Sequence, residues 1–310
     1  ATAFSAKSQE TGKSPLDHIG VPVFQMIFST SKKASWRRNA IGLNSSDLAM
    51  HIALPEVDGR INGGIVSFKS DQAFDPDLQF PISKHKVEKT LSSKLINKVQ
   101  KWHALKSKKN EDKKIAIVLS SYPGRDFQLA HALGLDTIKS TTHILSFLGE
   151  HGFNFSQPDL FFEKLKSSKI EIPIMLYESL LDTIPLKLRS ELFKTWGGFE
   201  TDTFFENDKF VLQGYKSDNF FVIVQPSRGL LEDKKADYHD LAKPPCHSYV
   251  AMYLWLQLHN IDAFLHMGTH GSLEWLPGKT VGLSTHCWPE LLVNDTPFIY
   301  PFIVNDPGEA

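Results

Sequence analysis

This sequence has few cysteines, almost no net charge and no long apolar run. Each of these absences excludes a class of protein. The two cysteines, Cys246 and Cys287, are far apart and form no Cys-X-X-Cys pair. This excludes a disulfide framework and a four-cysteine zinc site, and it fits a cytoplasmic protein. Because 34 basic and 35 acidic residues nearly cancel, no global field attracts nucleic acid or a membrane. No apolar stretch approaches the ~20 residues of a membrane span.

A nucleotide-binding loop is also lacking. Gly278-Lys279-Thr280 resembles the end of a P-loop, but a P-loop needs another glycine five positions before Gly278, where this chain has Leu273. Pro277 offers no backbone N–H to a phosphate. We therefore expect that this chain does not bind ATP by itself.

The hydrophobic residues that are present predict an α/β fold. At 310 residues and 41% hydrophobic, the chain is long enough for two domains with cores of their own. Spacings of three and four predict an amphipathic helix over residues 83–106, and a continuous run at 115–119 predicts a strand buried on both faces. A loop and a helix over 141–148 follow. This order predicts a doubly wound α/β fold with largely parallel sheets and flanking helices.

The second half of the chain begins after a helical region. Residues 157–196 have a mostly helical pattern that ends at Trp196-Gly197-Gly198, so we predict domains at 1–198 and 199–310. Paired strands over 210–215 and 220–225, a long polar loop, a helix over 247–258 and a short strand from residue 263 are expected beyond it.

That last strand leads into the segment with the most chemistry. His266, His270 and Glu274 recur at four-residue intervals, which would place them on one face of a helix. Gly268 and Gly271 argue against a continuous helix, although a loop could still bring the three side chains together as metal ligands. The alternative is a structural turn at residues 270–271, with Glu274 as a first-turn carboxylate of a helix. His-Glu-X-X-His is absent, so a zinc protease is not expected.

A second group of polar residues lies between residues 225 and 240. Gln225 ends a strand, so its amide is expected to face a pocket. Arg228 is a fixed cation that binds carboxylates through two parallel hydrogen bonds. His239, between Tyr238 and Asp240, has acids near it and is a candidate proton carrier or ligand. The alternative for each of them is a solvated loop residue.

Several long segments in the same order resemble one known family. Residues 225–256 (QPSRGLLEDKKADYHDLAKPPCHSYVAMYLWL), 266–284 (HMGTHGSLEWLPGKTVGLS), 287–292 (CWPELL) and 299–310 (IYPFIVNDPGEA) are similar to the large subunit of aerobic cobaltochelatases, the CobN type. They resemble the homologous large subunit of magnesium chelatases less closely. Residues 48–61, 115–126 and 134–141 agree, so the resemblance covers essentially the whole chain.

The resemblance implies a function that the residues alone do not. The family's large subunit binds the tetrapyrrole and is taken to hold the insertion site, while separate AAA+ partner subunits hydrolyse ATP. It implies Co²⁺ as the substrate metal and hydrogenobyrinic acid a,c-diamide as the substrate in cobalamin biosynthesis. Because family members are much longer, this chain is expected to be an internal, multi-lobed part of a larger protein.

Specific roles follow from this resemblance. We expect His266, His270 and Glu274 to line the insertion pocket as metal ligands, with Glu274 as the preferred base. The residues expected to bind the macrocycle are Gln225, Arg228, Tyr238, His239, Trp275 and Lys279. Two alternatives stay open: a magnesium chelatase subunit that acts on protoporphyrin, and a structural fragment without activity.

Overall fold

The chain forms two compact units. The computed structural model describes residues 16–71, 73–120, 135–155, 160–217, 219–229, 240–268 and 273–301. The first unit comprises Ala1–Trp102 and Gly278–Cys287, and the second comprises His103–Pro277 and Trp288–Ala310. The predicted division at residue 198 stays a prediction.

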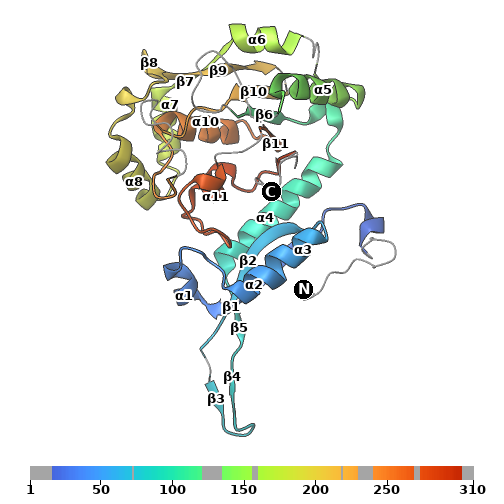
Figure 1. Ribbon diagram of the computed structural model, residues 1–310, viewed down its shortest axis with the longest axis vertical. Coiled ribbons are helices and arrows are strands. Elements are labelled where there is room, and N and C mark those ends of the chain that lie inside the picture. The colour runs from blue at the N-terminus through green and yellow to red at the C-terminus, as the bar shows by residue number, and fades with distance from the viewer. Residues whose placement is uncertain are drawn as a thin grey trace. The chain divides into compact units, whose positions relative to one another are not determined.

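The second unit is built on a seven-stranded sheet (Figure 1). Its order is β12 (Phe298–Ile299), β11 (Ala263–Met267), β6 (Ile115–Leu119), β10 (Phe220–Val224), β9 (Lys209–Ser217) and β7 (Lys169–Pro173), with β8 (Phe205–Glu206) paired to β9. The four strands from β12 to β10 are parallel, whereas β9 is antiparallel to β7, β8 and β10.

Helices cover both faces of this sheet. Along β6, Ala116 and Val118 join one buried cluster, while Ile115, Ile117 and Leu119 join the other, because successive side chains of a strand point to opposite faces. The first cluster packs under α7 (Ile174–Leu181), α8 (Leu186–Trp196), α10 (His247–Leu258) and α11 (Trp288–Val293). The second packs under α5 (Thr137–Glu150) and α6 (Phe161–Ser167). The predicted α/β class with flanking helices is confirmed.

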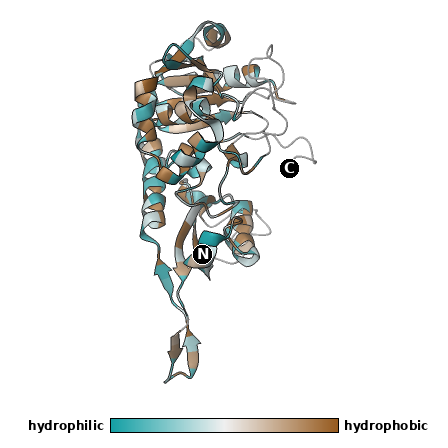
Figure 2. Cartoon of the chain, turned by 90° about the vertical axis from the view of Figure 1, so that its left-hand side faces the viewer, coloured by the Kyte–Doolittle hydropathy of each residue, from teal (hydrophilic) through white to brown (hydrophobic). Residues whose placement is uncertain are grey.

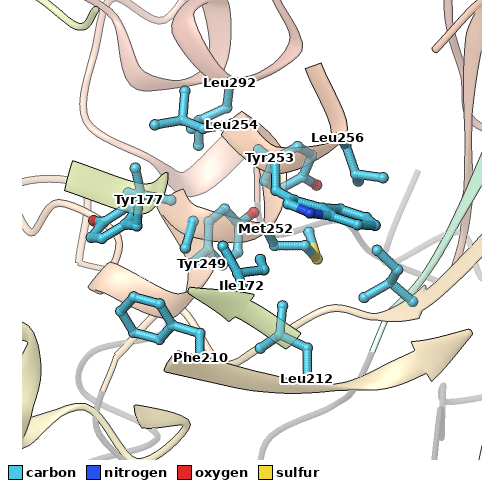
Figure 3. Packing of buried hydrophobic residues seen from close by; sticks show 14 of the residues in the cluster. Ile172, Tyr177, Phe210, Leu212, Tyr249, Met252, Tyr253, Leu254, Leu256 and Leu292 are labelled. Carbon is cyan, nitrogen blue, oxygen red and sulfur yellow. The ribbon is translucent and has the colours of Figure 1, made fainter. Parts of the chain in front are cut away.

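Helix α10 lies at the centre of the larger cluster (Figure 3). Its residues from His247 to Leu256 are all buried, including Tyr249 and Tyr253. Tyr177 of α7 and Phe210 of β9 contact each other edge to face beside it, with ring centroids 5.1 Å apart. Burial of large aromatic rings supplies much of the stability of such a core.

The first unit has a smaller sheet of three strands. β1 (Phe24–Lys32) is parallel to β2 (Ile61–Lys69), which is antiparallel to β5 (His85–Val87). The unit's helices are α1 (Lys33–Arg38), α2 (Ser45–Leu48), a π-helical stretch (Ala49–Ala53), α3 (Leu54–Val57) and the first part of α4 (Lys89–Ser107). Short 3-10 turns lie at Asp17–Ile19, Asn110–Asp112, Phe199–Thr201 and Leu273–Trp275.

A hairpin of β3 (Ala73–Asp75) and β4 (Phe80–Ile82) belongs to this unit and extends away from its three-stranded sheet (Figure 1). Figure 2 shows hydrophobic residues along this hairpin. The side chains of Phe74, Leu78 and Phe80 are more than 60% exposed. Because these side chains are so exposed, the hairpin adds little to the unit's core.

One predicted helical region contains a strand that was not predicted, and one predicted helix is less buried than its spacing indicates. Most of the described residues 160–196 are helical, as predicted, but the unpredicted strand β7 lies between α6 and α7 and buries its alternate residues Ile170 and Ile172. The predicted helix over 83–106 forms as α4, but its apolar residues are only partly buried. Leu95 is the buried residue of α4, whereas Ile96 and Val99 are 56% and 40% exposed. Helical spacing reports amphipathicity, and it does not report what covers the apolar side.

The segment Gly278–Cys287 leaves the second unit in sequence and completes the first. Trp36 Nε1 donates a hydrogen bond to the Gly282 carbonyl at 2.9 Å, and Val281 N donates to the Ile41 carbonyl at 3.0 Å. Gly42 has φ +96°, and a Cβ atom there would lie 1.9 Å from the Val281 carbonyl oxygen. The segment therefore fits against a backbone that only glycine permits.

No helix among the described residues is long and apolar enough to cross a membrane.

Replacing Gly42 with alanine should destabilise the first unit by about 2 kcal/mol or more, because backbone strain and a collision with Val281 add up. Urea unfolding followed by tryptophan fluorescence measures the loss. Gly64→Ala is the matched control, since Gly64 has φ +90° with no atom within 4 Å of an added Cβ. Equal losses in the two variants would show that the contact with Val281 does not constrain the fold.

Candidate functional site

Three parallel strands end side by side at one edge of the large sheet. The ladder continues past their ends, because Ser120 N donates to the Met267 carbonyl at 2.8 Å and Gln225 N donates to the Leu119 carbonyl at 2.9 Å. These bonds fix Ser120, Gln225 and the end of β11 next to one another. Ligands of α/β proteins bind at such carboxyl ends, so this edge is the candidate site.

His266 is a buried histidine at this edge. It points to the same face as Phe264, and its Nε2 lies 2.8 Å from Ser120 Oγ. The rings of Phe298 and Tyr300 flank it, with centroids 5.8 and 5.5 Å away. Burial lowers the pKa of His266 from 6.5 to about 4, so its imidazole is neutral near pH 7. Neutral imidazole is the form that binds metals.

Gln225 fixes two buried tyrosines of α10. Its Nε2 donates to Tyr249 Oη at 2.9 Å and to Tyr253 Oη at 2.7 Å. Tyr249 and Tyr253 lie one turn apart, and Figure 3 shows both hydroxyls. Burial raises the pKa of Tyr253 well above its ordinary value, and the charge of Glu274 adds to this effect. The amide therefore faces buried phenols, and the Glu274 carboxylate is close enough to influence one of them.

Glu274 lies in the short turn Leu273–Trp275. Leu273 and Leu276 on either side are buried in the same cluster as Tyr249 and Tyr253, and Leu276 N donates to the Leu273 carbonyl at 3.2 Å. Glu274 itself is exposed. The turn thus holds a solvent-accessible carboxylate on a backbone that its neighbours anchor.

Arg228 contacts backbone carbonyls. Its Nη1 donates to the Trp275 carbonyl at 2.7 Å, and its Nη2 donates to the carbonyls of Asp240 and Lys243 at 2.6 and 2.8 Å. The residue is 3% exposed. These hydrogen bonds occupy N–H donors of the guanidinium with which Arg228 would bind a substrate carboxylate.

Lys279 belongs to the first unit. Its ammonium donates to the carbonyls of Trp36 and Asn39, both at 2.6 Å, next to the end of α1. A cation at the carboxyl end of a helix compensates the helix dipole. These contacts describe a structural role, and its predicted contact with the macrocycle stays a prediction.

Three predicted residues, His270, Tyr238 and His239, lie outside the described residues. Within the described ranges, no group of three histidine, cysteine, aspartate or glutamate side chains is placed to hold a metal ion. The proposed set of His266, His270 and Glu274 includes one residue beyond those ranges, so it stays a prediction.

A cavity of about 400 Å³ lies in the first unit and contains none of the predicted residues. Its polar lining includes Asp17, Asp58 and Arg60, and Arg60 binds Asp58 Oδ2 at 3.1 Å. We therefore place the candidate site at the sheet edge of the second unit, where the polar groups converge.

Sequence reasoning missed Ser120 and the roles of Tyr249 and Tyr253. Ser120 is the first polar residue after the buried run at 115–119, and strand-end position alone marks it as a candidate. The two tyrosines lie in the helix that the sequence predicted over 247–258, but no role was predicted for their hydroxyls. Their signal was chemical, because a buried phenol needs a hydrogen-bond partner.

Comparison with known proteins identifies the family. The model of the CobN/Magnesium Chelatase family matches residues 1–310. The chain belongs to this family. Aerobic cobaltochelatase subunit CobN of Sinorhizobium sp. is 36% identical to it over 100% of this chain and 26% of that protein. Magnesium-chelatase subunit ChlH of Oryza sativa subsp. indica is 29% identical over 95% of this chain and 21% of that protein.

A solved cobaltochelatase subunit has a similar fold. The catalytic subunit of cobaltochelatase from Mycobacterium tuberculosis is 30% identical and superposes with a TM-score of 0.81, over 99% of this chain and 27% of that one. The chain thus spans about a quarter of the length of its cobaltochelatase relatives.

The lowered pKa of His266 predicts acid sensitivity. In the unfolded chain the His266 imidazole binds a proton as the pH falls below 6.5. In the folded protein it binds that proton only near pH 4. The free energy of unfolding should therefore fall as the pH falls through this window, by at most about 3 kcal/mol from His266. The urea midpoint between pH 7 and 4.5 measures this.

The glutamine variant His266→Gln should flatten that pH dependence. Burial also lowers the pKa values of His247 and His259, so part of the slope should remain. His143→Gln, at an exposed position of α5, is the control and should leave the slope unchanged. An unaltered slope in His266→Gln would contradict the assignment.

Proposed function

We propose that this chain contributes the insertion site of a metal chelatase subunit. The subunit inserts Co²⁺ into hydrogenobyrinic acid a,c-diamide in cobalamin biosynthesis. One observation carries the proposal. In a member of the CobN/magnesium chelatase family, the neutral His266 imidazole and the Gln225 amide lie at the carboxyl ends of parallel strands. The turn that carries Glu274 is anchored in the same buried cluster as the two tyrosines that this amide binds.

The chemistry of insertion suits these groups. Metal insertion removes two N–H protons from the macrocycle and water from the ion. Glu274 is exposed, so a substrate can reach its carboxylate, which suits the role of a proton acceptor or a transient ligand. His266 is neutral near pH 7, and neutral imidazoles are suitable ligands for Co²⁺. We propose that His270 completes this set.

We propose contacts with the macrocycle for three of the six residues that the sequence predicted. Gln225 is left out because its amide binds two buried tyrosines. Trp275, Tyr238 and His239 remain our candidates, with the two rings of Trp275 and Tyr238 packing on the macrocycle's apolar faces. The hydrogen bonds of Arg228 and Lys279 to backbone carbonyls support structural roles for these two cations.

Identity supports the cobalt branch of the family. The chain is 36% identical to a CobN subunit and 29% identical to a ChlH subunit. We propose that AAA+ partner subunits hydrolyse ATP for the reaction, which takes place in the cytoplasm. The absence of a P-loop glycine at Leu273 agrees with this division of labour.

The variant Glu274→Gln in the full-length subunit should slow Co²⁺ insertion about 100-fold or more, because a positioned base contributes that much. Tetrapyrrole binding, measured by tryptophan fluorescence, should stay within about twofold, because the amide preserves the shape of the carboxyl group. The insertion assay includes the ATPase partners.

The matched control is Glu163→Gln. Glu163 is exposed and belongs to α6, a helix that packs on the face of the sheet opposite α10. Normal insertion by Glu274→Gln would disprove the base assignment.

Titration with protoporphyrin distinguishes the magnesium branch, since tighter binding of protoporphyrin than of the corrinoid would support a magnesium chelatase subunit.

A further inference from the structure

The Arg228 side chain connects its own segment with two others, one 12 to 15 positions away and one 47 positions away in sequence. Its guanidinium binds the carbonyl of Trp275 in the turn Leu273–Trp275 and those of Asp240 and Lys243. Its own carbonyl accepts a hydrogen bond from Cys246 N at 2.9 Å, just before α10 begins. The segment that follows β10, residues 240–246 and the turn with Glu274 therefore meet at this residue.

The chemistry of these contacts explains why the residue is an arginine. Burying a cation is costly unless hydrogen bonds compensate it, and Arg228 is 3% exposed. A guanidinium offers five N–H donors in a rigid plane, so it can bind separate carbonyls in fixed directions. A lysine ammonium is compact and flexible, and it cannot reproduce that geometry.

The contact with the turn is next to the proposed base. Trp275 directly follows Glu274, and its carbonyl oxygen lies 2.7 Å from Arg228 Nη1. Leu273 and Leu276 anchor the turn through their buried side chains. The guanidinium adds the polar attachment, so it restricts the backbone from which the Glu274 side chain extends.

We propose that Arg228 is a positioning residue that fixes the turn carrying Glu274, and that it acts on metal insertion through Glu274 without contacting the tetrapyrrole. This inference rests on the proposed function of Glu274. It differs from the expectation from sequence, in which the guanidinium bound carboxylates of the substrate.

Arg228→Lys in the full-length subunit with its ATPase partners tests the proposal. The turnover number for Co²⁺ insertion should fall about tenfold or more, because small misplacements of a reacting group are costly. The KM and the dissociation constant for the tetrapyrrole should stay within about twofold, which a substrate contact would not allow. Arg189→Lys is the control, since Arg189 is an α8 residue paired with Asp182.

Hydrogen–deuterium exchange provides a readout other than activity. The Leu276 amide, which donates to the Leu273 carbonyl, should exchange faster in Arg228→Lys than in the wild type. Amides in the middle of α10 should be unchanged. Unaltered exchange at Leu276 would overturn the proposal. If the lysine variant does not fold, Arg228→Gln keeps two planar donors and is tested in the same way.

The double variant Arg228→Lys/Glu274→Gln separates this inference from the proposed function. If Arg228 acts through Glu274, the double variant should be no slower than Glu274→Gln alone. Normal insertion by Glu274→Gln would remove the proposed function itself. A slow Glu274→Gln with a normal Arg228→Lys, or a weakened tetrapyrrole affinity in Arg228→Lys, would overturn the positioning role alone.

Discussion

The parallel pairing of β6 with β10 on one side and β11 on the other is the constraint on which the candidate site depends. It requires the three strands to end at the same edge, so polar residues that follow them become neighbours. Ser120 and Gln225 are more than a hundred positions apart in sequence, yet the ladder places Ser120 beside the end of β11 and Gln225 beside the end of β6. The hydrophobic runs of the strands thus determine where the chemistry is concentrated.

Local patterns predicted much of this arrangement. The continuous apolar run at 115–119 marked a strand buried on both faces, and the strand from residue 263 led correctly to His266 at its end. Such patterns succeed because burial on a sheet requires a particular residue type at each position. They failed for β7, whose short alternation lies within a region of helical spacing.

Tertiary contacts could not be predicted from these local patterns. Nothing in the local sequence of Arg228 indicates that its partners are carbonyls at residues 240, 243 and 275, because a guanidinium is equally suited to a substrate carboxylate. The pairing of Ser120 with His266 likewise depends on strand order, which residue spacing does not report. Chemical type was predictable from sequence, whereas the partner depended on the fold.

The ten residues Gly278–Cys287 belong to the first unit although they come late in the chain, and this has a consequence for biosynthesis. Trp36 and Gly282 are separated by 246 positions, so the small unit stays incomplete until the ribosome has passed residue 282. At about 5–20 residues per second, this wait lasts on the order of ten to fifty seconds. During that time the surface of Trp36 that later binds Gly282 is uncovered, which makes the nascent first unit a candidate client for chaperones.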